Sequence, residues 1–317
     1  MNTKLEARTI SVEELVAAVA KDPKGLVAAE ENRYHSEIAA VADAVHHGRG
    51  HRHIVLLSGP SSSGKTTTAE LLGRALGERG TAAHVVSLDD FYLGAGKAPL
   101  LPDGKPDYET LDALNVDLLV QCLQELVRDG KTELPQFDFS TGNPKAETVP
   151  LWLEPDAAVI LEGIHAFNPR LQAYLPQEMI TRLFINPLSR FELGGRLWLQ
   201  RRDIRLMRRI LRDDQFRASP FANTMEMWPQ VVRGEALYLF PYADGADCVV
   251  NTTFAYEPCV YRTLLTPRLE AVDAHTPDFD TARRLIDRLA VFLPLSADIL
   301  PAGSMLREFT GFQSALS

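Results

Sequence analysis

Short apolar runs alternate with longer amphipathic stretches along the chain. Five short runs predict buried strands, because each is apolar and is bounded by turn residues: 54–57, 83–88, 157–161, 182–186 and 247–251. Apolar positions repeat at helical spacing between them, over 11–20, 28–47, 115–129, 188–217 and a tail that extends to about residue 293. Strands that alternate with helices predict an α/β fold, in which a parallel sheet is wrapped by helices.

The order of these elements divides the chain into three regions. We expect residues 51–262 to form the α/β domain, with a helical extension over 1–50 and a helical tail over 263–317 that packs on the domain. Residues 132–153 alternate in polarity and carry prolines, which predicts a hairpin beside the main sheet.

The composition is that of an ordinary globular protein, with 317 residues and a formal net charge of −9. This acidity argues against a general nucleic-acid or anionic-membrane partner, although it is compatible with a local basic site. No run approaches the length of about 18 apolar residues that a membrane span needs, and the N-terminus lacks an apolar signal core. Three cysteines, Cys122, Cys248 and Cys259, lie far apart, so we expect free thiols and a cytoplasmic location.

The loop after the first strand carries the clearest chemical signal. Gly59, Gly64, Lys65 and Thr66 match the phosphate-binding pattern G-x-x-x-x-G-K-[ST], between an apolar strand and a helical run. A loop of small residues lets backbone N–H groups point inward at polyphosphate, and the helix that begins near Lys65 adds its positive end. Lys65 is expected to reach the β- and γ-phosphates, and the Thr66 hydroxyl to bind Mg²⁺. An ordinary Gly/Ser turn is the alternative interpretation.

Acidic residues follow two further strands. Asp89 and Asp90 end the second strand, and Glu162 ends the third. Ligands of open α/β sheets lie beyond the carboxyl ends of the strands, so Asp89 could accept a proton from a substrate hydroxyl or help to hold Mg²⁺, and Glu162 could orient Mg²⁺. For Asp89 the alternative is a cap of the next turn. For His165 a structural role is as compatible with the sequence as a substrate contact.

Seven arginines fall within residues 201–217. Four of them repeat at spacings of 4, 3 and 4, which places them along one helical face: Arg201, Arg205, Arg208 and Arg212. Three more add to the cluster: Arg202, Arg209 and Arg217. Such a row suits a transferring phosphoryl group, whose charge spreads over its oxygens. Ion pairs with nearby aspartates, or a nucleic-acid face, are the alternatives.

Residues 46–53, with the sequence HHGRGHRH, are rich in histidine. Two glycines interrupt the stretch, and no Cys or ordered carboxylate accompanies it. A solvated linker is therefore a better interpretation than a metal site.

Several motifs in series resemble the uridine kinase / phosphoribulokinase family. They are GPSSSGKTT, SLDDFY, LPQFDF, VILEGIHAFNP, RLMRRILRD and PYADGADCVVNTT, and their order and spacing match that family from about residue 54 to 257. The flanking stretches ENRYHSEIAAVADAV and FLPLSADILPAGSMLREFTG resemble a bacterial uridine kinase-like branch. Longer members of that branch carry a region similar to part of threonyl-tRNA synthetase, and this chain looks like the stand-alone form.

The resemblance implies a P-loop NTPase-type fold and a set of site residues. The loop from Gly59 to Thr67 would hold the phosphates of ATP, through Gly59, Ser61, Ser62, Ser63, Gly64, Lys65, Thr66 and Thr67. Asp89 would be the catalytic base near the metal, Glu162 the magnesium-associated acid, and Asp107 the acid that holds the ribose hydroxyls. An arginine-rich lid over about 196–220 would close over the phosphates with Arg208, Arg209, Arg212 and Arg217.

The acceptor side departs from the family pattern. Phe137 stands where uridine-cytidine kinases have a Tyr, and Gly142 stands where they have a His; in the family both side chains contact the pyrimidine base. Phe137 can stack on a base but cannot hydrogen-bond to it, so acceptor specificity is expected to differ. The expected acceptor-binding residues are Tyr92, Asp107, Phe137 and His165.

We therefore expect an ATP- and Mg²⁺-dependent kinase that phosphorylates a small-molecule hydroxyl, in the first place a nucleoside 5′-hydroxyl. Its catalytic residues would be Lys65, Asp89, Arg208 and Arg212. The alternatives are a kinase of the same fold for a sugar phosphate, pantothenate or a sugar, and a nucleotide-binding regulatory protein. We expect neither nucleic acid nor membrane as a partner; the choice of ATP or GTP and homo-oligomerisation are left open.

Overall fold

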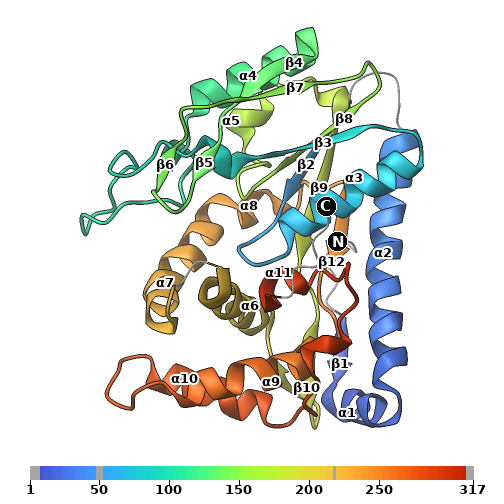
Figure 1. Cartoon of the computed structure of the whole chain (residues 1–317), viewed down its shortest axis with the longest axis vertical. Helices are drawn as coiled ribbons and strands as arrows, with labels where there is room; N and C mark the ends of the chain where they lie inside the picture. Colours follow the sequence, from blue (N-terminus) through green and yellow to red (C-terminus); the bar gives the residue numbers. More distant parts are fainter. Residues whose placement is uncertain (1–7, 48–52, 217–218, 312–317) are drawn as a thin grey trace.

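A computed structural model describes residues 8–47, 53–216 and 219–311. Its centre is a sheet of five parallel strands in the order β12-β9-β2-β8-β3 (Figure 1). These strands are β2 (His53–Ser58), β3 (Ala83–Ser87), β8 (Ala158–Glu162), β9 (Ile180–Asn186) and β12 (Cys248–Asn251). The five predicted strands and the parallel α/β fold are confirmed, with small differences at the strand ends.

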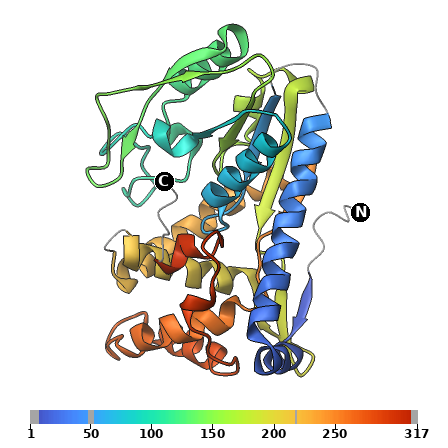
Figure 2. The ribbon, with the colours of Figure 1, turned by 45° about the vertical axis from the view of Figure 1, so that its right-hand side comes forward.

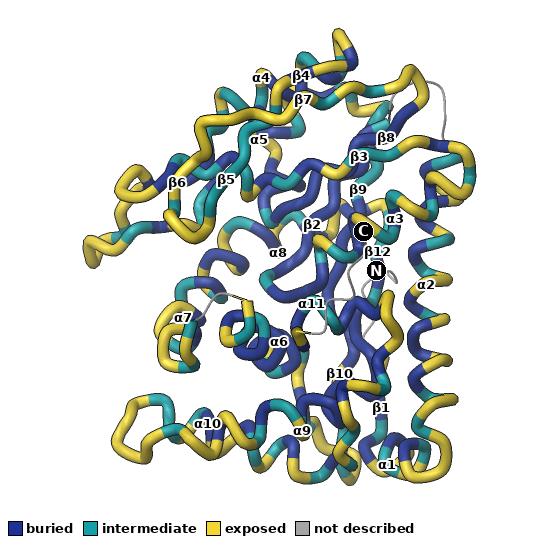
Figure 3. Tube along the Cα trace, viewed as in Figure 1, coloured by how far each residue is buried: buried dark blue, intermediate teal, exposed yellow. Residues whose placement is uncertain are grey.

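Alternate side chains of the sheet face two separate apolar layers. Val55 and Leu57 of β2 belong to a cluster with α2 (Pro23–His47) and α3 (Lys65–Glu78). Ile54 and Leu56 belong to a second cluster with α4 (Val116–Asp129). Because both faces of the sheet are covered, its strands read as continuous apolar runs, and the chain trace is buried along β2 and β8 (Figure 3).

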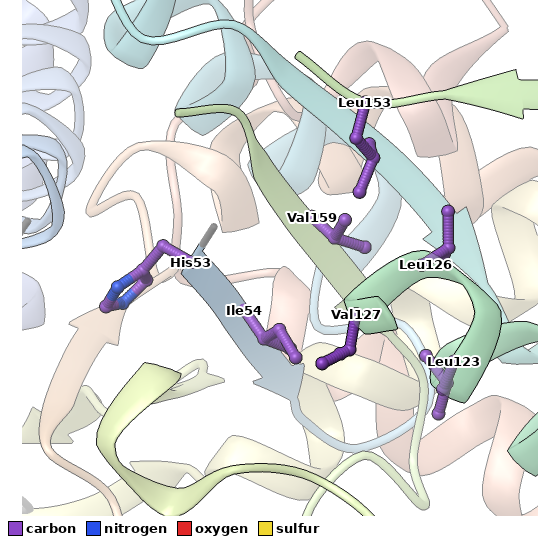
Figure 4. Close-up of a pocket in the computed structure, with 7 residues that line it drawn as sticks. All are labelled: His53, Ile54, Leu123, Leu126, Val127, Leu153 and Val159. Carbon is purple, nitrogen blue, oxygen red and sulfur yellow. The ribbon is translucent and has the colours of Figure 1, made fainter. Parts of the chain in front are cut away.

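A small apolar gap lies between α4 and the sheet. Its lining includes Ile54 of β2, Val159 of β8 and Leu123 of α4 (Figure 4). The volume of the gap is about 10 Å³, which is no larger than a single water probe. It is therefore a packing defect of the second core and not a ligand site.

Smaller sheets and further helices surround the central layer. The small sheets pair β4 (Lys131–Leu134) with β7 (Val149–Trp152), β5 (Phe137–Asp138) with β6 (Asn143–Pro144), and β10 (Arg190–Leu193) with both β1 (Thr9–Ser11) and β11 (Arg196–Leu199). The other helices are α1 (Val12–Lys21), α5 (Pro169–Gln172), α6 (Arg201–Phe216), α7 (Phe221–Tyr238), α8 (Phe240–Ala243), α9 (Glu257–Glu270), α10 (Phe279–Leu289) and α11 (Arg307–Thr310). The predicted hairpin over 132–153 is thus observed as the β4–β7 pair, with β5 and β6 between the two strands.

The prediction of one helix over 188–217 is wrong in its first half. Residues 190–199 form the β10–β11 hairpin, and α6 begins only at Arg201. Gly194 and Gly195 adopt φ values of +57° and +72°, which a right-handed helix does not allow. The hairpin also finds a partner strand in β1, which the local pattern cannot reveal. The second helix, predicted over 28–47, begins earlier: α1 ends at Lys21, and Pro23 is the first residue of α2, where its missing N–H has no cost.

The N-terminal and C-terminal regions share the core of the sheet. The first cluster contains buried residues of α1 and α2 together with residues of α9, α10 and α11. The expected boundary at residue 262 falls inside α9, so the chain is continuous helix there. No helix in the described ranges is long and apolar enough to cross a membrane.

Candidate functional site

The phosphate-binding loop joins β2 to α3, as the sequence predicts. Ser62 has a φ of +59° and Gly64 a φ of +89°, and this left-handed geometry turns successive N–H groups to the same side of the loop. A Cβ atom on Gly64 would lie 2.5 Å from Sδ of Met305. A side chain is therefore excluded at Gly64 both by its backbone conformation and by its neighbour.

The loop presents donors that suit an anion. The Ser62 and Ser63 hydroxyls are buried and have no hydrogen-bond partner within the described chain. Nζ of Lys65 contacts the carbonyl oxygen of Pro60 at 3.3 Å. Thr66 and Thr67 follow in the first turn of α3, whose N–H groups lack partners inside the helix. A polyphosphate fits this donor set, because it would satisfy the buried hydroxyls and the helix terminus together.

Two carboxylates lie beside the loop because β3 and β8 end next to it. The Ser87 hydroxyl donates to Oε1 of Glu162 at 2.8 Å. Burial first, and then the charge of Asp89, raise the pKa of Glu162 to about 7, while Lys65 acts in the opposite direction. A carboxyl group in that state is poised to bind a cation, and carboxylate and hydroxyl oxygens are the ligands that Mg²⁺ prefers.

The described residues contain no cluster of three or more His, Cys, Asp or Glu side chains arranged for a metal. Mg²⁺ in phosphoryl-transfer sites is usually held by one or two carboxylates together with the phosphates, so the expected ligands Thr66, Asp89 and Glu162 do not require such a cluster. The histidine-rich stretch is only partly described: His46 and His47 end α2 and His53 begins β2, whereas residues 48–52 lie outside the described ranges.

Two arginines of α6 donate hydrogen bonds to Ser61 of the phosphate loop. Nε of Arg205 donates to the carbonyl oxygen of Ser61 at 2.9 Å, and Arg209 donates to the Ser61 hydroxyl at 2.9 Å. Arg212 pairs with Asp213 at 3.1 Å, and its side chain is 16% exposed. Arg217 lies outside the described residues.

Arg208 was expected to contact the phosphates from the lid, but it lies in the core instead. Its side chain is fully buried and pairs with Glu257 at 2.8 Å. It also donates to the carbonyl oxygens of Thr252 at 2.6 Å and Ser62 at 3.3 Å, and it lies over the ring of Phe309. These partners occupy the guanidinium, which therefore joins the loop to the core. The spacing of the arginines could not distinguish this position from the exposed ones.

Glu235 is a site residue that the sequence analysis missed. Its Oε1 accepts a hydrogen bond from the Ser61 N–H at 2.8 Å and also pairs with Arg205. The side chain is almost completely buried on α7, far from the loop in sequence. The only local signal was an acid in an otherwise unexplained helix.

Polar groups that are buried or half-buried lie where the sequence predicts the acceptor. Asp107 is 6% exposed, and its Oδ1 accepts the Glu109 N–H at 3.1 Å. Burial, followed by the charge of Glu235, raises the pKa of Glu109 to about 8. Burial lowers the pKa of His165 to about 4, against the opposing effect of the nearby Glu109 and Thr110 backbone, so its ring is neutral at pH 7; neither ring nitrogen makes a well-aligned hydrogen bond with a described residue. Such a ring can donate to or accept from a ligand.

Aromatic residues border the same side. The rings of Tyr92 and Phe137 lie 5.6 Å apart, and those of Phe137 and Phe139 lie 5.1 Å apart. Asp90 accepts the N–H of Phe137 at 3.1 Å and thereby fixes the β5 strand. Gly142 has a φ of +67° in the following turn, so at this position the backbone favours glycine.

The C-terminal helix α11 reaches the phosphate loop, which the sequence analysis also missed. The Thr67 hydroxyl donates to Oε2 of Glu308 at 2.7 Å. Met305 contacts Gly64, and Phe309 covers the Arg208 guanidinium at 5.1 Å. Figure 2 shows α11 beside the end of α3 that carries the loop. A carboxylate thus lies at a helix N-terminus, where a phosphate would also bind.

We expect Glu308→Gln to bind ATP more tightly than the wild type. The carboxylate of Glu308 competes with phosphate for the first turn of α3, and removing one like charge at about 4 Å is worth about 1 kcal/mol, or roughly five-fold in affinity. Isothermal titration calorimetry would measure the dissociation constant. Glu270→Gln, an exposed change on α9, is the matched control, and weaker binding by Glu308→Gln would contradict the expectation.

Glu109→Gln tests this half-buried carboxyl group through stability. The pKa of Glu109 is higher in the folded chain than in the unfolded one, so its contribution to stability is present at low pH and is lost as the pH rises through about 8. Between pH 5 and 8, the free energy of unfolding should therefore fall by about 1 kcal/mol or more in the wild type relative to the variant. Urea denaturation measures this difference. The exposed Glu147→Gln should follow the wild type; equal pH dependence in Glu109→Gln would exclude the shift.

Comparison with known proteins agrees with this geometry. The sequence profile of the "Phosphoribulokinase / Uridine kinase family" matches residues 54–255. The chain is 31% identical over 201 residues to the uridine kinase of Salmonella paratyphi B, which covers 62% of this chain and 85% of that protein.

Two solved structures are similar in part. A possible uridine kinase from Bacillus stearothermophilus has 18% identity and a TM-score of 0.48, over 68% of this chain and 97% of that one. A D-glycerate 3-kinase from Cryptococcus neoformans has 17% identity and a TM-score of 0.32, over 92% of this chain and 88% of that one. The family profile covers most of the described α/β domain, including the phosphate-binding loop. The chain therefore belongs to the phosphoribulokinase / uridine kinase family and is an ATP-dependent kinase.

Proposed function

We propose that the chain transfers the γ-phosphoryl group of ATP to the 5′-hydroxyl of a nucleoside. The position of Asp89 carries the proposal: it lies in the turn after β3, two residues beyond Ser87, whose hydroxyl donates to Glu162 at 2.8 Å. Its charge raises the pKa of Glu162 beside the phosphate loop and also that of Glu109 on the acceptor side. Asp89 is itself exposed, so a substrate can reach it between the two groups. The relatives named uridine kinase support a nucleoside as the acceptor.

The acceptor side suits a ligand with a flat ring and hydroxyl groups. Phe137 and Tyr92 offer aromatic faces on which a base can stack. The buried carboxyl group of Asp107 can accept hydrogen bonds from ribose hydroxyls, with Arg233 at 3.8 Å. The neutral ring of His165 adds one donor and one acceptor.

In the proposed reaction, the Asp89 carboxylate takes the proton of the acceptor hydroxyl. The hydroxyl oxygen then forms a bond to the γ-phosphorus, the bond from that phosphorus to the β–γ bridging oxygen breaks, and ADP leaves. Lys65 and Arg212 would stabilise the charge on the transferring group, while Arg209 positions the loop through Ser61. Thr66, Asp89 and Glu162 would hold Mg²⁺, which neutralises phosphate charge when bound. We assign Arg208 no contact with the phosphates; it holds the loop in position through the Ser62 carbonyl and Glu257.

Asp89→Asn should lower turnover by roughly two to four orders of magnitude, because an amide cannot accept the proton. Lys65→Ala should cause a comparable loss, since it removes a cation from the phosphates. Steady-state ADP release measures both. Asp112→Asn, which breaks the surface pair with Arg170, is the matched control. Near-normal turnover of a folded Asp89→Asn would exclude Asp89 as the base.

A panel of acceptors identifies the substrate class. ADP release from Mg-ATP is measured with nucleosides, pantothenate, sugars and sugar phosphates, and Lys65→Ala provides the blank. We expect stimulation by a nucleoside, with a relaxed choice of base because Phe137 cannot hydrogen-bond to it. Stimulation by another acceptor alone would replace the proposed substrate. A flat panel with tight ATP binding would favour a regulatory nucleotide-binding protein.

A further inference from the structure

A second pocket lies behind the phosphate loop. It is formed by the β10–β11 hairpin, the start of α6, the second half of α7 and the end of β9, and its volume is about 400 Å³. Its lining includes four arginines: Arg190, Arg201, Arg202 and Arg205. These belong in part to the row that the sequence analysis singled out, but the proposed reaction uses neither Arg201 nor Arg202.

The pocket is separate from the acceptor side. On α7, Gly234 abuts Glu109 and Tyr238 lies 6.1 Å from the ring of His165, so one face of the helix borders the acceptor. Val232 and Ala236 line the second pocket. Residues two positions apart are about 200° apart around a helix, so these side chains point away from the acceptor. Arg205 and Glu235 line the pocket and also bond to Ser61, so the pocket adjoins the loop through this buried pair.

The charges in this pocket are not balanced. Arg205 pairs with Glu235, and Arg190 pairs with Glu192 at 3.1 Å. The side chains of Arg201 and Arg202 make no hydrogen bond or ion pair with any described residue. The nearest acid in sequence, Asp203, is used by Arg284 at 2.8 Å and by the Gln200 N–H. Burial and the neighbouring Arg190 lower the pKa of Arg201, because both disfavour its charged form.

The other residues that line the pocket indicate which kind of anionic ligand would pair with Arg201 and Arg202. Asn186 is 4% exposed at the carboxyl end of β9, where ligands of such sheets bind, and its Oδ1 has no partner among the described atoms. Leu197 and Phe240 are 47% and 42% exposed and form an apolar border. Guanidinium groups recognise phosphate with paired N–H donors, and the apolar border suits the remainder of a small molecule.

We propose that this pocket binds a phosphate monoester of a small metabolite, with Arg201 and Arg202 on the phosphate and Leu197 and Phe240 beside its apolar part. The site is distinct from the phosphate loop and does not depend on which acceptor the kinase uses. Phenyl phosphate is the probe, because it carries a phosphate and an apolar ring but no hydroxyl that the kinase could phosphorylate.

Calorimetric titration with phenyl phosphate tests the proposal in saturating Mg-ADP, which fills the phosphate loop. We expect the wild type to bind the probe and the double variant Arg201→Gln/Arg202→Gln to bind it at least ten-fold more weakly. Arg74→Gln/Arg283→Gln, on exposed faces of α3 and α10, removes the same charge and should bind like the wild type.

The same titrations contain the results that would overturn the site. Absence of binding to the wild type would reject it, and so would equal binding by the wild type and the Arg201→Gln/Arg202→Gln variant. Equal weakening of binding in the Arg74→Gln/Arg283→Gln control would show that the loss of affinity comes from the overall charge of the protein, and would also reject the site. Matching unfolding temperatures of the three proteins would show that a loss of binding is not a loss of folding. Acceptor-dependent turnover is measured separately, so failure here leaves the nucleoside kinase proposal intact.

Discussion

The buried ion pair between Arg208 and Glu257 connects the parts of the molecule on which the phosphate loop depends. Arg208 comes from α6 and Glu257 from the start of α9, and the same guanidinium holds backbone carbonyls of the loop and of the segment after β12. Removing one partner of such a pair leaves an uncompensated charge in the core, at a cost of about 3–5 kcal/mol. The pair therefore anchors one side of the loop, on which the Ser62 and Ser63 hydroxyls have no partner within the described chain.

The central fold and the loop could be predicted because their signals are local. An apolar run followed by G-x-x-x-x-G-K-[ST] requires only neighbouring residues, and Asp89 and Glu162 follow directly from strand ends. The contacts of Glu235 and Glu308 are different, since each carboxylate meets the loop from more than 170 residues away in sequence. No spacing rule covers such a distance. The hairpin over 190–199 was missed for the same reason, because its partner strand β1 is remote.

The arginine row shows where pattern reasoning stops. Helical periodicity correctly placed Arg205, Arg208 and Arg212 on one side of α6. Periodicity does not say what lies opposite that side, and the three guanidinium groups have different environments: one bound to Glu235, one buried with Glu257 and one near solvent beside Asp213. Equal spacing therefore concealed unequal roles, which only the packing of α7, α9 and α11 defines.

The contacts of α11 also have a consequence for synthesis of the protein. The loop at residues 59–67 emerges from the ribosome early, whereas Met305, Glu308 and Phe309, which contact the loop or the arginine beneath it, emerge more than two hundred residues later. During translation the nascent sheet must therefore hold its phosphate loop without the contacts of these three residues. The order of synthesis thus delays completion of the nucleotide site until almost the whole described chain is available to fold.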